Sequence, residues 1–212
     1  MTHKIVEDMK WRYACKKFDP AKKLSEEEVD TLLESLRLTA SSYGLQPWKF
    51  LLVKNEKTRE ELTAAAFGQQ QVKDASHLIV LCEKEEMNEE HVDAFLKDTS
   101  ETRGVDLESL QGFKNMLMKM IVQKPVEKKL SWAKNQIYIA MGTLLAVCAR
   151  LRVDSCPMEG FKPNEVDRIL KLRERGLRSV LMCPVGHRAE DDVYTERLKV
   201  RFKKEEVVEV VE

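Results

Sequence analysis

The sequence predicts a sandwich of α-helices and β-strands, and two observations carry this prediction. Three short apolar runs, at residues 48–55, 77–83 and 178–188, have the length and composition of buried strands. Segments with the apolar spacing of amphipathic helices separate these runs, as expected when helices cover a sheet. No repeat, low-complexity tract or linker interrupts the 212 residues. We therefore expect one domain over residues 1–212.

Three helices are predicted in the first third of the chain. A short one lies before Pro20, and its apolar residues recur at helical spacing: Ile5, Val6, Met9 and Tyr13. The second opens with a capping box made by Ser25 and Glu28 and covers residues 25–42. The third follows the first strand, and Thr58 is its expected cap.

The rest of the chain predicts four more helical segments and a strand-like tail. Residues 87–123 are charged with periodic apolar positions, which indicates two surface helices joined near Gly104. Residues 130–153 are apolar all round in their middle, which indicates a helix buried in a core or a subunit interface. A helix ended by glycine is predicted over residues 162–176. The alternating tail 207–212 is typical of an edge strand that pairs with a neighbour.

Composition argues against partners that are drawn in by a strong overall charge. The 36 Lys and Arg residues equal the 36 Asp and Glu residues in number. There is thus no net field for nucleic acid or an anionic membrane, and nucleic-acid binding through the basic segments is disfavoured. Any anion site must be local.

The cysteines indicate a reducing compartment. The five are widely scattered, with no Cys-x-x-Cys pair and no histidine at metal-ligand spacing. We expect reduced thiols, no metal site and a cytoplasmic protein. The charged N-terminus lacks the apolar run of a signal peptide, and no segment has the length of a membrane span.

Two basic pairs are candidates for a local anion site. Arg12 and Lys16 are four residues apart and would share a face if the first helix continued, while Lys199 and Arg201 alternate near the other end. Both pairs could equally be solvated surface residues. The glycine-rich fingerprints of dinucleotide and nucleoside triphosphate sites are absent, so a bound phosphate would be held mainly by side chains.

Two loop segments combine residue types that chemistry can use. "CPMEG" could be a simple turn, or its Glu159 could be a general base, although it has no identified partner. "SSYGLQPW" places two serine hydroxyls and a glycine at the crossing from a helix to a strand. His77 and His187 lie at strand boundaries and are expected to be structural.

Six segments, taken together and in this order, resemble the FMN-dependent nitroreductase family. They are Arg12 with Lys16, "SSYGLQPWKF", "GQQQVKDASHLIVL", "PMEGF", "PVGHR" and "LKVRF", and they span nearly the whole chain. The resemblance implies an α+β fold, a three-layer α/β/α sandwich with a mixed central sheet. It also implies an intertwined homodimer with two FMN sites at its interface.

The resemblance also implies roles for individual residues. Arg12, Lys199 and Arg201 match positions that bind the FMN phosphate, and Lys16 matches a lysine beside the flavin pyrimidine edge, where a cation stabilises the reduced flavin. Gln69 and Gln71 lie where the family places side chains against the same edge. The backbone N–H of Glu159 would approach flavin N5, so a general-base role for Glu159 loses its support.

Further residues complete the predicted site. Ser41 and Ser42 match residues that reach FMN from the partner subunit, and Tyr43 and Met118 are expected to border the substrate channel. Ala14 stands where a serine is common, and Ala40 where a proline is common. The predicted cofactor-binding residues are Arg12, Tyr13, Ala14, Lys16, Ser41, Ser42, Gln69, Gln71, Gln136, Pro157, Met158, Glu159, Gly160, Lys199 and Arg201.

The activity that the resemblance implies is an NAD(P)H-dependent flavin oxidoreductase. FMN would take a hydride from NAD(P)H and reduce a nitroaromatic, a quinone or a similar small acceptor by a ping-pong mechanism, with no side chain acting as catalytic acid or base. Two alternatives remain open. One is reduction of pteridine, enone or halogenated substrates on the same scaffold, and the other is a non-enzymatic flavin carrier or sensor. Neither NADH nor NADPH is favoured by the sequence.

Overall fold

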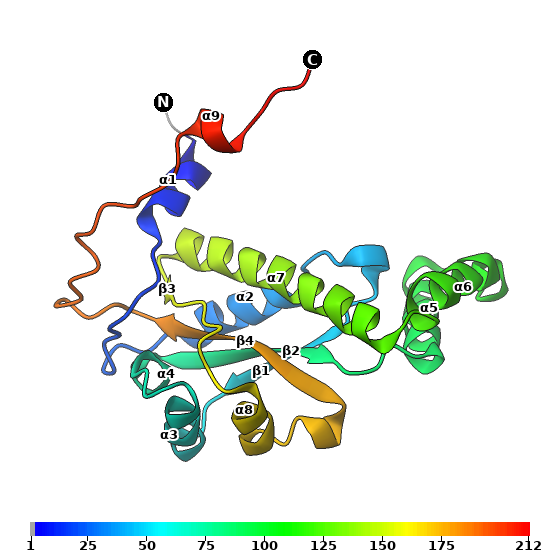
Figure 1. The fold of residues 1–212 in the computed structure, drawn as a ribbon, viewed down its shortest axis with the longest axis horizontal. Helices are drawn as coiled ribbons and strands as arrows, with labels where there is room; N and C mark the ends of the chain where they lie inside the picture. The colour runs from blue at the N-terminus through cyan, green and yellow to red at the C-terminus, as the bar shows by residue number, and fades with distance from the viewer. Residues whose placement is uncertain (1–2) are drawn as a thin grey trace.

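A four-stranded sheet lies between two helical layers in the computed structural model, which describes residues 3–212 (Figure 1). The sheet order is β1-β2-β4-β3, and the strands are β1 (Trp48–Val53), β2 (His77–Lys84), β3 (Asp154–Ser155) and β4 (Leu177–Gly186). One face is covered by α2 (Glu26–Arg37) and α7 (Val126–Leu151), and the other by α3 (Glu56–Ala65), α4 (Gln71–Asp74) and α8 (Pro163–Ile169). The predicted three-layer sandwich is confirmed.

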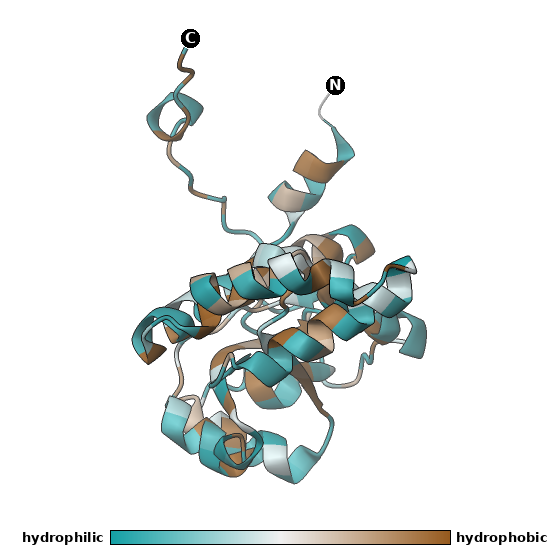
Figure 2. Ribbon diagram, turned by 90° about the vertical axis from the view of Figure 1, so that its right-hand side faces the viewer, coloured by the Kyte–Doolittle hydropathy of each residue, from teal (hydrophilic) through white to brown (hydrophobic). Residues whose placement is uncertain are grey.

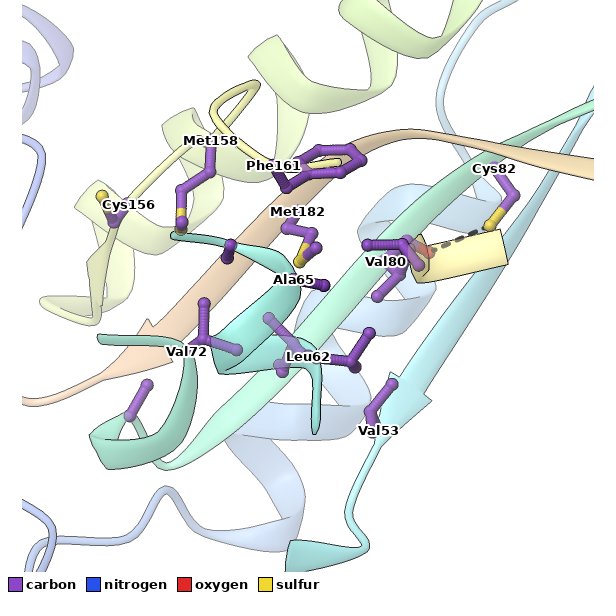
Figure 3. Close-up of a cluster of buried hydrophobic side chains, with 14 of the residues drawn as sticks. Val53, Leu62, Ala65, Val72, Val80, Cys82, Cys156, Met158, Phe161 and Met182 are labelled. Carbon is purple, nitrogen blue, oxygen red and sulfur yellow. Dashed lines mark hydrogen bonds between the residues drawn. The ribbon is translucent and has the colours of Figure 1, made fainter. Parts of the chain in front are cut away.

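The position of the central strand β2 explains why its sequence is continuously apolar. Its side chains alternate between the two faces of the sheet, and both faces are covered. Val80 and Cys82 pack into the cluster beneath α3, α4 and α8, which Figure 3 shows in close-up. Ile79 and Leu81 pack into the opposite cluster beneath α2 and α7. The three predicted strand runs are thus confirmed.

All pairings between the named strands are antiparallel, from β1 with β2 to β4 with β3. The parallel contribution to the sheet is an isolated bridge between Ala14 and Ser155. Within residues 3–212, the mixed character expected of the sheet is limited to this bridge.

The charged segment 87–123 folds at one end of the sheet. It forms α5 (Glu89–Arg103), η2 (Glu108–Leu110), α6 (Gln111–Leu117) and a π-helical turn, η3 (Met118–Val122). Gly104 ends α5 with φ 65°, a left-handed backbone that glycine adopts at low cost. The predicted junction of two helices at Gly104 is confirmed.

The predicted helix over residues 130–153 is confirmed as α7, which is 26 residues long. One side of it is buried against the sheet, while Tyr138 and Ile139 on the other side are about half exposed. Among residues 3–212, no helix combines the length and the apolar character that crossing a bilayer requires.

Helix boundaries differ from the predictions in three places. The capping box of Ser25 and Glu28 is confirmed, but α2 ends at Arg37. Asn55 caps α3 by accepting from the N–H of Thr58, so the assignment of the cap to Thr58 was wrong by one helical turn. A single helix over 162–176 was also wrong. The helix α8 ends at Ile169, the φ of 52° at Lys171 prevents its continuation, and η4 (Arg173–Arg175) follows.

Both chain ends project from the sandwich on the same side (Figures 1 and 2). The N-terminal segment forms α1 (Lys4–Trp11), and the C-terminal segment holds the short helix α9 (Lys204–Val207). The predicted pairing of the tail 207–212 with a neighbour stays a prediction, because within the described single chain the tail contains part of α9 and forms no strand ladder. A strand needs a neighbour to satisfy its backbone groups, and the sequence pattern alone does not supply one.

Candidate functional site

A cavity of about 540 Å³ lies between the end of α1 and the segment 194–201. We call it the cation pocket, because six of its lining residues are basic: Lys10, Arg12, Lys16, Arg197, Lys199 and Arg201. Glu196 is the one acidic residue among those that line it. The two basic pairs from opposite chain ends therefore meet at one cavity.

The end of α1 places Arg12 in the cation pocket. The helix stops at Trp11, and Arg12 has an extended backbone with φ −68° and ψ 142°. The shared helix face expected for Arg12 and Lys16 is therefore wrong. Both residues reach the pocket along an extended chain. The Trp11 ring is held by the guanidinium groups of Arg152, at 4.9 Å, and Arg188, at 4.5 Å.

The electrostatics of the cation pocket favour an anion. Burial and the nearby Arg201 charge both lower the pKa of Arg12. Burial, followed by the charges of Arg12 and Arg201, lowers the pKa of Lys199. The buried Nε of Arg12 has no hydrogen-bond partner within the described part of the chain. An anion in the pocket would satisfy this donor and offset the repulsion between the cations.

A second group of residues, which we call the inner cluster, consists of Lys16, Gln69, Gln71, Cys156 and Gly160. Lys16 Nζ lies 3.7 Å from Cys156 Sγ. Gln69 Nε2 donates to the Gly160 carbonyl at 2.7 Å, and Gln71 Nε2 donates to Gln69 Oε1 at 3.1 Å. Burial raises the pKa of the Cys156 thiol, and the Lys16 charge opposes this rise. The cluster therefore presents one cation and two amides without a carboxylate.

The segment Pro157–Gly160 continues the inner cluster. Met158 exchanges two backbone hydrogen bonds with Met182 of β4, at 2.8 and 3.0 Å. Its side chain is 4% exposed and points into the core (Figure 3). Neither the side chain nor the backbone N–H of Met158 is thus available to a ligand. The N–H groups of Glu159 and Gly160 have no acceptor within residues 3–212.

Glu159 is held from α7. The hydroxyl of Tyr138 donates to its carboxylate, and burial together with this bond raises the pKa of Tyr138 to about 12. The carboxylate of Glu159 is therefore engaged by a neutral phenol, while the N–H groups of Glu159 and Gly160 are the donors that have no acceptor within residues 3–212.

The remaining predicted residues fall into two groups. Tyr13 lines the cation pocket with Ala14, and its hydroxyl bonds to Asp192 and Thr195. Residues that do not line the cation pocket in the single chain are Ser41, Ser42, Tyr43, Met118 and Gln136. Of these, Ser42 donates its N–H to Gln136 Oε1 at 2.9 Å, and Met118 packs against the cluster under α5 and α6.

Three residues of the site were missed from the sequence. They are Tyr138, Cys156 and Asp192, which contact Glu159, Lys16 and Tyr13 respectively. Cys156 directly precedes Pro157 and could have been flagged by position. Asp192 lies in the acidic run 190–192, where nothing distinguishes a buried carboxylate from exposed ones.

The chain is thus an α+β protein with a helix-covered sheet, a cavity lined by six basic residues, and an amide-lined cluster beside it. The nitroreductase family matches residues 9–187, and the chain belongs to this family. This agrees with the resemblance carried by its motifs.

Individual relatives extend the match over the full chain. The major NAD(P)H-flavin oxidoreductase of Aliivibrio fischeri is 31% identical, with 100% of both chains covered. A structure from Exiguobacterium sibiricum, solved in complex with FMN, has a TM-score of 0.83 at 20% identity and covers 100% of this chain and 99% of its own. An enone reductase of gut-bacterial fatty acid saturation, CLA-ER, has a TM-score of 0.81 at 16% identity and covers 100% and 99%. At such identities the two structures support the fold alone.

Proposed function

We propose that the protein is an FMN-dependent oxidoreductase that uses NAD(P)H, with the FMN phosphate in the cation pocket and the flavin ring at the inner cluster. The observation that carries the proposal is the convergence of Arg12, Lys199 and Arg201 beside the cluster of Lys16 and two glutamines. The similarity to the Aliivibrio fischeri NAD(P)H-flavin oxidoreductase supports the same activity.

The residues present fit FMN in both of its polar parts. A phosphate carries about −1.5 to −2 charges near neutral pH, which matches a pocket of clustered cations with an unpartnered Arg12 Nε. The pyrimidine edge of a flavin has both acceptors and a donor, and Lys16, Gln69 and Gln71 supply complementary groups. The N–H groups of Glu159 and Gly160, which have no acceptor within residues 3–212, lie beside Gln69 and would add two donors.

The chain contributes binding, orientation and electrostatics. The chemistry that FMN supplies when bound is hydride uptake from NAD(P)H and delivery of electrons to a second small acceptor. Lys16 forms no ion pair within residues 3–212, so its charge is available to stabilise negative charge that develops on the ring. Tyr138 holds the carboxylate of Glu159, and the pairing of Met158 with Met182 holds the backbone that leads to the Glu159 N–H. No side chain is required as a catalytic acid or base.

We further propose that the working unit is a homodimer in the cytoplasm. The side chains of Leu198, Val200 and Phe202 are 92%, 85% and 78% exposed, which is costly in a monomer. A second copy that covers them could also bring Ser41 and Ser42 to the cofactor, since these serines do not reach the cation pocket within one chain. Five unpaired, buried cysteines suit a reducing compartment.

The reductive half-reaction tests the activity. The yellow holoprotein should be bleached by NADH or NADPH in a stopped-flow instrument and recoloured by an acceptor, with ping-pong kinetics at steady state. A panel of nitroaromatics, quinones and enones then ranks the acceptors. Absence of bleaching by either nicotinamide would contradict an enzymatic role and favour a flavin carrier.

A further inference from the structure

Asp192 is a buried carboxylate that joins the two chain ends behind the cation pocket. Its side chain is 4% exposed and does not line the pocket. Its Oδ2 accepts from the Tyr13 hydroxyl at 2.8 Å and from the backbone N–H groups of Lys16 and Lys17 at 3.2 and 3.3 Å. Its Oδ1 accepts from the N–H of Tyr194 at 3.1 Å.

These contacts make Asp192 a clamp between two segments that carry the pocket cations. Residues 13–17 continue directly from Arg12 and include Lys16, while the turn around Asp192 continues through Thr195 toward Lys199. A carboxylate that accepts several N–H and O–H donors is held more firmly than one that makes a single contact. Asp192 is thus a main link between the two sets of cations, beside the hydroxyl pair of Tyr13 and Thr195 at 3.0 Å and the bond from the Lys199 ammonium group to the Arg12 carbonyl.

The neighbouring acid shows that this arrangement is specific to one position. Asp191 is exposed, with 69% of its side chain accessible, and it pairs with the ammonium group of Lys17. Such a surface pair contributes little to structure. Asp192, in contrast, forms no ion pair within the described residues, and its charge is balanced by hydrogen-bond donors from both chain ends.

We propose that Asp192 is a positioning residue for the cofactor phosphate. By clamping residues 13–17 to residues 192–195, it sets the geometry of Arg12, Lys199 and Arg201, and so gives the protein its preference for FMN over a flavin without a phosphate. This inference rests on the proposed function. It adds a residue that acts through others and that the family motifs do not contain.

The preference for phosphate provides a readout that a merely structural role would not move. The dissociation constants of FMN and riboflavin are measured by flavin fluorescence on wild-type protein, on Asp192→Asn and on Asp191→Asn. Asparagine keeps the shape of Asp192 but places an NH₂ group or a neutral oxygen against the donors. We expect Asp192→Asn to raise the FMN dissociation constant by about tenfold or more, which is the effect of losing one charge-assisted contact. The dissociation constant of riboflavin should change much less. Asp191→Asn should leave both unchanged.

Two results would overturn the inference: equal weakening of FMN and riboflavin by Asp192→Asn, or no weakening of either. If Asp192→Asn does not fold, Tyr13→Phe removes one donor to the same carboxylate, and it should lower the preference for FMN in the same direction by a smaller factor. An unchanged preference in Tyr13→Phe would then overturn the inference. A wild-type protein that does not distinguish FMN from riboflavin would contradict the proposed phosphate pocket itself, and the role of Asp192 with it.

Discussion

The cation pocket and the inner cluster share Lys16 but are held in place by different forces. The inner cluster rests on the body of the protein, since the segment Pro157–Gly160 pairs with β4 and the side chain of Met158 belongs to the core. The cation pocket lies between two chain ends outside the sandwich, where polar contacts such as those of Asp192 fix its residues. Apolar burial therefore supports the part that would act on the flavin ring, and hydrogen bonds support the part that would hold the phosphate.

This difference predicts that substitutions separate into two classes. Substitutions in the sandwich of sheet and helices, which we call the body, should lower the free energy of unfolding. Substitutions in the cation pocket should lower cofactor affinity with little effect on unfolding of the apoprotein.

The largest effect is expected beneath the inner cluster. Met182 is fully buried and its backbone pairs with Met158, so Met182→Ala should lower the free energy of unfolding by about 2–5 kcal/mol. Met116 is 38% exposed on α6, and Met116→Ala should stay within about 0.5 kcal/mol of wild type. Urea denaturation of the apoproteins measures both. Equal stability of the two variants would show that the segment does not rest on the core.

The next effect is a pH-dependent change in stability at Glu83, a residue of β2 in the body. Burial raises the pKa of Glu83 to about 7, above the ordinary value of 4.5 that applies in the unfolded chain. The folded protein thus binds more protons between these pH values, so this group's contribution to stability falls as pH rises from about 4.5 to about 7. Glu83→Gln should gain on the order of 2–3 kcal/mol at pH 8 and little near pH 4.

Thermal unfolding at the two pH values checks this, with the exposed Glu86→Gln as the control. The FMN affinity of Glu83→Gln should match that of wild type. A gain of the same size at both pH values would mean that Glu83 does not titrate in this range.

A smaller effect, on binding only, is expected in the cation pocket. Arg201→Ala should weaken FMN binding by about 1.5–3 kcal/mol, which is roughly 10- to 150-fold, because a charge-assisted contact to the phosphate is lost. Arg103→Ala, which removes an exposed arginine on α5, is the matched control. Retention of FMN on dilution measures both variants. Affinity equal to wild type would remove Arg201 from the site.

The smallest effect concerns a helix cap in the body. Asn55→Ala should lower the free energy of unfolding by about 1 kcal/mol, because the Asn55 side chain satisfies the N–H of Thr58. Thr58→Ala keeps that acceptor and should cost less. The reverse order in a denaturation experiment would restore Thr58 as the cap.

Local patterns predicted the parts of the fold that local physics decides. The apolar run of β2 and the capping box at Ser25 depend on neighbours within a few residues, so the sequence contains the whole signal. The tail 207–212 has an equally clear strand pattern, but its pairing partner is not local, and the single chain forms no ladder there.

The site was predictable only in part, for the same reason. The motifs indicated Arg12, Lys199 and Arg201 as a set, but only the folded chain brings residues from its two ends to one cavity. No pattern predicted that Asp192 is buried, because its donors come from both chain ends: the Tyr13 hydroxyl, the Cys15 thiol, and the N–H groups of Lys16, Lys17 and Tyr194. The motif "PMEG" likewise did not show that the Met158 side chain faces the core, since this depends on its pairing with Met182.

The central claim is that the inner cluster acts on the flavin ring and that the cation pocket holds the phosphate. The midpoint potential of bound FMN in Lys16→Ala and Arg201→Ala tests this claim most directly. Loss of the Lys16 charge should make the potential more negative by roughly 30 mV or more, while loss of Arg201 should change affinity and leave the potential near that of wild type. A wild-type potential in Lys16→Ala, or a larger shift in Arg201→Ala, would contradict the assignment of the ring to the inner cluster and of the phosphate to the cation pocket.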